Sequence, residues 1–135
     1  MNVCVIGIGA MGGGMAKSLL RSSEISNVVG FDRSEELMRK FHAEASMSNK
    51  SALSNPPATL DEAILEAKTD AVVLVLVNES QCEQVCFGNE GKNVYEYLKG
   101  SKKETSCVML CSTVSGETIH GFVPQRSHLS FFLTL

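Results

Sequence analysis

The sequence predicts an α/β fold in a single domain, built on a doubly wound parallel sheet. A buried strand begins at the second residue and runs straight into a glycine-rich turn with the spacing G-x-G-x-x-G. Strand and helix patterns then alternate along the chain, as a parallel sheet with right-handed crossovers requires. The clearest strand, Ala71–Val77 (AVVLVLV), is apolar throughout, which is the pattern of a strand buried on both faces.

Chain length, composition and net charge exclude several classes of protein. The 135 residues suit one domain, and 44% apolar with 20% charged residues can form a packed core. A net charge of −3 gives no broad basic surface, so we expect no nucleic-acid partner. No apolar run reaches the roughly 18 residues of a membrane span, so we expect no membrane partner. Because Met1 leads directly into the first strand, we expect a cytoplasmic location, unless an organellar targeting segment is missing from the chain.

The first half of the chain is expected to form two strand–helix units. The strands are placed at Asn2–Ile6 and Asn27–Asp32, and the helices at Met11–Arg21 and Ser34–Ala45. The second helix begins with a serine N-cap and two glutamates, which favour the positive end of the helix dipole.

A loop rich in Ser, Asn and Pro should follow over Ser46–Ala58, with a short strand near Glu44–Met47 as an option. Thr59-Leu60-Asp61-Glu62 has the pattern of a capping box and predicts a helix that ends at about Lys68.

The second half continues the alternation after Asn78, which ends the central strand. The expected elements are a helix at Glu79–Phe87, a turn at Gly88–Gly91, a helix at Lys92–Leu98 that stops by Gly100, and a strand at Ser106–Leu110. Ser115 is expected to cap a short helix that ends at Pro124.

The glycine-rich turn predicts a Rossmann-type dinucleotide site. Gly7 would allow the tight turn, Gly9 would let a pyrophosphate approach the backbone, and Gly12 would let the next helix sit close to the sheet. The free N–H groups at the start of that helix favour phosphate. Asp32 lies about 20 residues further on, where the motif places the acid that binds the adenosine ribose. The alternative is a glycine-rich turn that binds nothing.

The cysteines and histidines predict no metal site. Cys4, Cys107 and Cys111 fall in predicted buried strands, and Cys82 and Cys86 lie one helical turn apart. We interpret all five as small, reduced core residues. The spacing is not C-x-x-C, and the histidines, at positions 42, 120 and 128, are scattered and expected on the surface or in the tail.

The G-x-G-x-M-G-x-x-M-A run from Gly7 to Ala16 resembles the N-terminal signature of the β-hydroxyacid dehydrogenases. This family includes 3-hydroxyisobutyrate and L-threonate dehydrogenases and, more distantly, 6-phosphogluconate dehydrogenase. The segments Val72–Gln81 and Phe87–Gly91 are also similar to it, most of all to its L-threonate dehydrogenase branch. Cys111–Ser115 resembles the family's S-S-T-V-S substrate segment, with a cysteine in place of the first serine.

The resemblance implies NAD or NADP as cofactor, with the pyrophosphate on the backbone of Ile8–Gly12. The expected cofactor-binding residues are Gly7, Ile8, Gly9, Ala10, Met11, Gly12, Asp32, Arg33, Leu76, Val77, Asn78 and Thr113. Ser112 and Thr113 are expected to face nicotinamide and substrate; the alternative is a hydroxyl pair that only caps backbone groups. Asp32 favours NAD whereas Arg33 could bind the 2′-phosphate of NADP, so NAD is only slightly favoured.

The resemblance covers about residues 2–121, which gives an NAD(P)-binding domain over 1–121 and a tail unlike the family over 122–135. The family's D-x-P-V-S-G-G segment, its helical C-terminal domain and the G-x-x-G-x-G-x-x-x-K-x-x-x-N motif with the catalytic lysine are absent. None of the chain's lysines has that context, so we assign no catalytic residue.

We therefore expect the cofactor-binding domain of a dehydrogenase for a 3-hydroxyacid such as L-threonate or 3-hydroxyisobutyrate, truncated and inactive alone. It would bind that substrate only when a C-terminal domain completes it. The alternatives are a stand-alone NAD(P)-binding sensor or interaction module, and a truncated product with no stable function. Homo-oligomerisation is left open.

The apolar end of the tail, Leu129–Leu135 (LSFFLTL), allows two structures. It contains β-favouring residues and could pair on the sheet edge. Pro124 shortens the preceding helix, and a chain terminus is disordered unless tied down, so we favour a loose tail.

Overall fold

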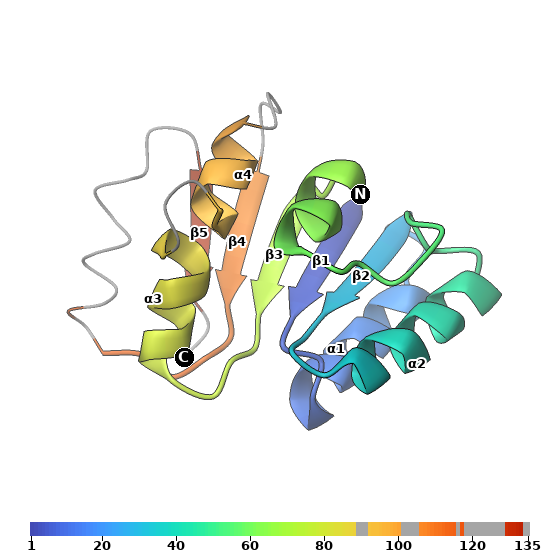
Figure 1. Cartoon of the computed structure of the whole chain (residues 1–135), viewed down its shortest axis with the longest axis horizontal. Coiled ribbons are helices and arrows are strands. Elements are labelled where there is room, and N and C mark those ends of the chain that lie inside the picture. The colour runs from blue at the N-terminus through green and yellow to red at the C-terminus, as the bar shows by residue number, and fades with distance from the viewer. Residues whose placement is uncertain (89–91, 101–105, 116, 118–128, 134–135) are drawn as a thin grey trace.

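The structure, a computed structural model, describes residues 1–88, 92–100, 106–115, 117 and 129–133. Its centre is a five-stranded parallel sheet in the order β2-β1-β3-β4-β5 (Figure 1). The strands are β1 (Asn2–Ile6), β2 (Asn27–Phe31), β3 (Ala71–Leu74), β4 (Ser106–Leu110) and β5 (Leu129–Leu133). The helices are α1 (Ala10–Arg21), α2 (Glu35–Met47), the π-helix η1 (Glu62–Glu66), α3 (Glu79–Phe87) and α4 (Val94–Gly100).

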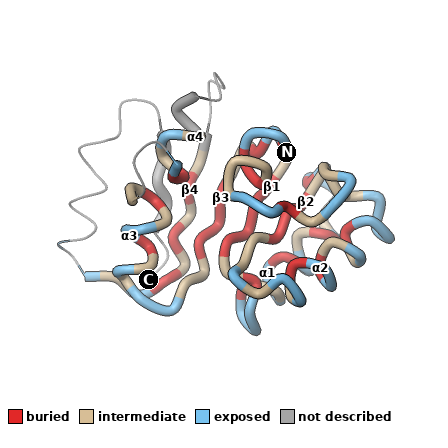
Figure 2. Tube along the Cα trace, in the orientation of Figure 1, coloured by how far each residue is buried: buried red, intermediate tan, exposed pale blue. Residues whose placement is uncertain are grey.

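Helices cover both faces of the sheet, because side chains in each central strand alternate between two cores. Val3, Val5 and Val73 face a core that α1 and α2 complete. The intervening residues, such as Cys4 and Val72, face a second core that η1, α3 and α4 complete. Figure 2 shows the buried run along the central strands between these layers. The predicted doubly wound α/β fold is confirmed.

The sheet reverses its strand order between β1 and β3. The chain runs from β1 outward to β2 and then crosses to β3, on the other side of β1. In open parallel sheets, ligands bind outside the carboxyl ends of the strands at such a reversal. The glycine-rich turn after β1 lies at this position.

Helix α2 runs further than its sequence pattern predicts. Its N-cap is Ser34 as expected, since the hydroxyl accepts a hydrogen bond from the Leu37 N–H at 3.3 Å. The helix continues to Met47, so the optional short strand near Glu44–Met47 is wrong. The last core residue of α2 is Ala45, and the helix continues two residues beyond it before Ser48 ends it.

The capping box forms, but the helix that follows is a π-helix. The Thr59 hydroxyl accepts from the Glu62 N–H at 3.4 Å, and the Glu62 carboxylate accepts from the Ala58 N–H at 2.7 Å. The wider turn brings the Ala67 N–H to the Glu62 carbonyl at 3.2 Å, five residues back. The element ends at Glu66, short of the Lys68 that the sequence predicts.

The later elements differ from prediction mainly at their ends. Helix α3 and strand β4 match, whereas α4 begins at Val94 because the Asn93 side chain accepts from the Glu96 N–H at 2.9 Å. Strand β3 ends at Leu74 instead of Val77. The expected turn at 88–91 and the helix from Ser115 to Pro124 lie mostly outside the described residues.

The tail contributes a strand. Residues Leu129–Leu133 pair in parallel with β4, with Leu129 opposite Ser106 and Leu133 opposite Leu110. The favoured expectation of a loose tail is therefore wrong for this segment, and the alternative of a strand on the sheet edge is confirmed. Within the part of the chain that is described, no helix has the length and apolar character needed to cross a membrane.

Candidate functional site

Gly7 and Gly12 hold the turn after β1 in a shape that no side chain would allow. Gly7 has φ +88°, and a Cβ there would lie 2.2 Å from the Val75 carbonyl oxygen. A Cβ on Gly12 would lie 1.8 Å from the Gly7 carbonyl oxygen. The start of α1 is thus packed directly on the turn, as the motif predicts.

Gly9 is different, because the space beside it is open. A Cβ built there meets nothing within 4 Å. Gly9 is also the N-cap of α1 and provides no side chain to bond the first N–H groups of the helix. The turn therefore presents unshielded backbone and the positive end of a helix dipole, a combination that suits an anion such as phosphate.

The residue between these glycines, Ile8, is anchored at two points. Its side chain is buried, and a Cβ on Gly30 would lie 3.0 Å from the Ile8 Cδ1. Its N–H donates to Asp32 Oδ2 at 2.9 Å. The other oxygen of Asp32 accepts from the Ser34 N–H at 3.0 Å. Asp32 thus joins the end of β2 to the glycine turn, and the Ile8 N–H is already bonded in this structure.

A cleft of about 340 Å³ opens beside the turn at the carboxyl ends of β1, β2 and β3. Six of its lining residues are among the predicted site residues: Gly7, Gly9, Asp32, Arg33, Leu76 and Val77. The structure adds an apolar wall that the sequence analysis missed, formed by Ile6, Phe31, Val75 and Val85, together with the polar Gln81. Gln81 and Val85 stand four residues apart on α3, a spacing that marks one helix face and could have identified them.

The remaining predicted cofactor residues are not in the lining of this cleft. Ile8 and Ala10 line a separate groove between α1 and α2. Met11 is exposed on α1, and Asn78 caps α3 by accepting from the Gln81 N–H at 3.0 Å. Thr113 is exposed beyond β4.

Ser112 is hydrogen-bonded to the backbone of the segment that follows β3. Its side chain is buried, and its hydroxyl accepts from the Leu76 N–H at 2.8 Å. This hydrogen bond is the backbone cap that one interpretation of the Ser112–Thr113 pair expects, and a contact with nicotinamide or substrate stays a prediction. Sequence spacing could not identify its partner, which is 36 residues away.

The cysteines are buried or half-buried thiols, as predicted for core residues. Burial raises the pKa of Cys4 to about 12 and also raises the pKa of Cys86 and Cys107. Burial raises the pKa of Cys82 as well, against a smaller opposing effect of its hydrogen bond to Ser112. These thiols are therefore protonated near neutral pH. Among the described residues, no group of three or more His, Cys, Asp and Glu side chains is placed to hold a metal ion.

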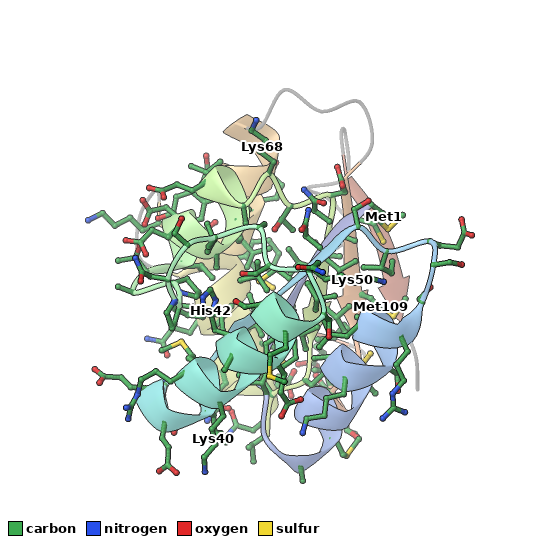
Figure 3. The ribbon with its side chains drawn as sticks, turned by 90° about the vertical axis from the view of Figure 1, so that its right-hand side faces the viewer. Met1, Lys40, His42, Lys50, Lys68 and Met109 are labelled. Atoms are coloured by element: carbon green, nitrogen blue, oxygen red, sulfur yellow. The ribbon has the colours of Figure 1, made fainter. Side chains whose placement is uncertain are left out.

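Within the described residues, no lysine or histidine lines the cleft. His42 contacts the hydroxyls of Ser46 and Ser51 on α2 and the loop that follows it. Lys40 pairs with Glu36 at 2.6 Å, and Figure 3 shows Lys68 at the opposite edge of the molecule from Lys40. His120 and His128 lie outside the described residues.

The comparisons with known proteins agree with this geometry. The chain matches the family model described as the NAD binding domain of 6-phosphogluconate dehydrogenase over residues 2–123. It is 37% identical over 90 residues to the L-threonate dehydrogenase of Cupriavidus necator, an alignment that covers 67% of this chain and 26% of that enzyme.

Two solved structures show the same fold. The 3-hydroxyisobutyrate dehydrogenase of Mycobacterium tuberculosis superimposes with a TM-score of 0.59 at 18% identity, over 98% of this chain and 38% of the other. A reductive aminase from Aspergillus terreus, solved with NADPH and ethyl levulinate, superimposes with a TM-score of 0.58 at 14% identity, over 98% of this chain and 39% of the other. The chain thus spans well under half the length of these relatives.

The family match covers nearly the whole chain and includes the turn, the cleft and the segment after β4. It confirms the resemblance that the glycine-rich run predicts. The chain belongs to the family of the NAD binding domain of 6-phosphogluconate dehydrogenase, to which hydroxyacid dehydrogenases are related.

Proposed function

We propose that this chain binds NAD or NADP at the carboxyl edge of its sheet and serves as the cofactor-binding part of a β-hydroxyacid dehydrogenase. The observation that carries the proposal is the contrast among the three motif glycines. Gly7 and Gly12 are closed in by the protein itself, whereas Gly9 faces open space beside a cleft. Packing explains the first two glycines, and an approaching ligand explains the third.

The residues around the cleft suit the two chemical parts of a dinucleotide. The pyrophosphate would lie at Gly9 and the start of α1, where N–H groups and the helix dipole attract it. The adenosine would occupy the apolar cleft between Arg33 and the α3 residues Gln81 and Val85, with its ribose at Asp32. When bound, the nicotinamide supplies hydride transfer, and the protein supplies binding and orientation.

The choice between the two cofactors depends on Asp32 and Arg33, which line the same cleft. A 2′-phosphate beside Asp32 would be repelled by roughly 4 kcal/mol at ~4 Å and an effective dielectric constant of ~20. Arg33 could return a similar amount by binding that phosphate. We favour NAD slightly, because Asp32 is fixed in place by two backbone N–H groups whereas the Arg33 residue is exposed.

For the whole enzyme we propose a 3-hydroxyacid substrate such as L-threonate, since the chain is 37% identical to an L-threonate dehydrogenase over 90 residues. The substrate would contact Thr113 and a further domain that carries the proton donor. A cytoplasmic location remains part of this proposal.

Titration calorimetry with NAD(H) and NADP(H) tests the cofactor site through one pair of alanine variants. Gly9→Ala puts a methyl group where the pyrophosphate should approach and should weaken binding at least tenfold. Gly14→Ala is the matched control, because its Cβ also meets nothing within 4 Å but Gly14 does not line the cleft. Equal affinity of both variants and the wild type would refute the site.

A further inference from the structure

Ser112 lies where three parts of the fold meet: the end of β4, the segment after β3, and α3. Its side chain is only 7% exposed. The hydroxyl oxygen accepts the Leu76 N–H at 2.8 Å, and the hydroxyl lies beside the thiol of Cys82, a buried residue of α3. The hydroxyl oxygen of Ser112 is thus used as an acceptor within the protein.

The hydrogen bond from Leu76 to Ser112 lies just beyond the last hydrogen bonds between neighbouring strands. The ladder between strands is still present one residue earlier, because the Val75 N–H donates to the Ile6 carbonyl at 2.9 Å and the Cys111 N–H donates to the Leu74 carbonyl at 2.9 Å. At the next residue the Ser112 hydroxyl replaces a strand as the partner. Leu76 lines the proposed cofactor cleft, so this bond sets the position of a cleft wall.

A second hydrogen bond ties the same two segments together. The Ser115 hydroxyl donates to Glu79 Oε1 at 2.5 Å, from the segment after β4 to the first residue of α3. The intervening Val77 N–H donates to Gln81 Oε1 at 3.3 Å. The segment from Leu76 to Glu79 is therefore held at both ends by serines of the segment that follows β4.

We propose that Ser112 is a positioning residue of the cofactor cleft, which holds Leu76 in place through its hydroxyl and does not touch nicotinamide or substrate. The inference rests on the proposed function for its ligand, although the hydrogen bond itself does not. It assigns Ser112 to the adenosine side of the site, whereas its place in the substrate-like segment suggests the nicotinamide side.

Removing the hydroxyl should weaken the binding of any ligand that uses the Leu76 wall. Ser112→Ala leaves the Leu76 N–H without its bond, so the wall must be ordered when the ligand binds, and we expect about a tenfold loss of affinity. The loss should be the same for NAD⁺ and for ADP-ribose, because both contain the adenosine that faces Leu76. If Ser112 contacted the nicotinamide directly, NAD⁺ binding would fall and ADP-ribose binding would not.

Calorimetry on the full chain therefore compares NAD⁺ with ADP-ribose in four proteins: the wild type, Ser112→Ala, Ser112→Thr and Ser48→Ala. Ser112→Thr keeps the hydroxyl and should restore most of the affinity for both ligands. Ser48→Ala is the control, because it also removes a hydroxyl that bonds the backbone, here by donating to the Glu44 carbonyl at 3.0 Å, and because Ser48 does not line the cleft. A loss confined to NAD⁺, or unchanged affinity for both ligands in Ser112→Ala, would overturn the proposal.

Hydrogen exchange of the Leu76 amide in ligand-free protein tests the bond without any cofactor. Protection in the wild type that Ser112→Ala removes and Ser112→Thr retains is the expected result. An unprotected Leu76 amide in the wild type would overturn the proposal even if the alanine variant failed to fold. If the wild type bound neither ligand, the proposed function would fail, and this exchange measurement would still decide whether Ser112 positions Leu76.

Discussion

At the scale of single residues, Asp32 has both a structural role and a proposed role in binding the cofactor. A ribose-binding acid is expected at the end of the second strand of a dinucleotide fold. Here both oxygens of that carboxylate already accept backbone N–H groups, from Ile8 at 2.9 Å and Ser34 at 3.0 Å. A carboxylate has room for further hydrogen bonds, so the same group can position the turn and bind a ribose.

Asp32→Asn should shift the cofactor preference toward NADP. The change removes the negative charge that repels a 2′-phosphate and leaves Arg33 in place to attract it. It also leaves a single acceptor oxygen for two backbone donors, so we expect affinity for NAD to fall several-fold. Titration of both cofactors measures the ratio. A wild type that binds NADP at least tenfold more tightly than NAD would refute the preference that we propose.

The buried thiol of Cys4 predicts how stability depends on alkaline pH. Burial raises its pKa from 9.0 to about 12. Above pH 9 the unfolded chain loses this proton while the folded protein keeps it, so the unfolded state binds fewer protons. The contribution of Cys4 is thus fully present below about pH 9 and is lost as the pH rises toward 12, by at most about 1.4 kcal/mol per pH unit.

Urea unfolding under reducing conditions at pH 8, 9 and 10 would measure this effect. Cys4→Ala lacks the thiol, so its free energy of unfolding should fall less steeply with pH than that of the wild type. Parallel pH profiles for the two proteins would show that Cys4 does not stay protonated in the folded state.

At the scale of elements, the packing of α1 onto the glycine turn is the contact on which the site depends most. Gly12→Ala places a Cβ 1.8 Å from the Gly7 carbonyl oxygen in the present geometry, so the helix or the turn must move. We expect a loss of roughly 2–4 kcal/mol in the free energy of unfolding. Gly14→Ala, with an open Cβ position in the same helix, should instead gain about 0.5–1 kcal/mol. Equal unfolding midpoints for the two variants would contradict this packing.

The elements that the sequence predicts best are those with a strong local pattern. Strand β4 and helix α3 begin and end where the apolar and capping patterns place them. The capping box at Thr59 predicts a helix start but cannot distinguish a π-helix from an α-helix, because the wider turn depends on how Ala63 and Ile64 pack against the sheet.

In the site as well, features set by local sequence could be predicted, and features set by contacts between distant segments could not. The glycine spacing identifies the turn, because Gly7 and Gly12 are required by close packing and Gly9 leaves open space beside the cleft. The apolar wall of the cleft and the role of Ser112 depend on contacts between distant segments, such as the bond from Leu76 to Ser112. After a strand ends, its two-residue alternation no longer indicates which side chains point inward, so Ser112 and Thr113 could not be told apart.

For the whole molecule, the described residues contain the features of a cofactor site and not those of a proton donor. The sheet, the turn and the cleft suit a dinucleotide, but no lysine or histidine among the described residues lines the cleft as a proton donor. General acid–base catalysis contributes about 10²–10⁴-fold to such reactions. The relatives that share this fold are more than twice as long as this chain, which covers 38% and 39% of two of them.

We therefore expect no measurable oxidation of L-threonate, 3-hydroxyisobutyrate or glycerate by this chain alone. NADH formation monitored at high enzyme concentration checks this expectation. Turnover at ordinary dehydrogenase rates would contradict it and would direct attention to His120 as a base. Co-expression with the C-terminal domain of a related dehydrogenase, followed by the same assay, would separate a cofactor-binding part of an enzyme from an independent NAD(P)-binding module.

Mapping NAD⁺ onto the backbone amides by NMR titration is the most direct test of the central claim. The cleft and the groove between α1 and α2 both border Gly9, but they lead to different residues. A dinucleotide in the cleft should shift the amides of Arg33, Leu76, Val77 and Gln81 in a saturable manner and leave those of Lys17 and Glu44 in the groove unchanged. Saturable shifts confined to Lys17 and Glu44, or no saturable shifts at all, would contradict the cofactor site.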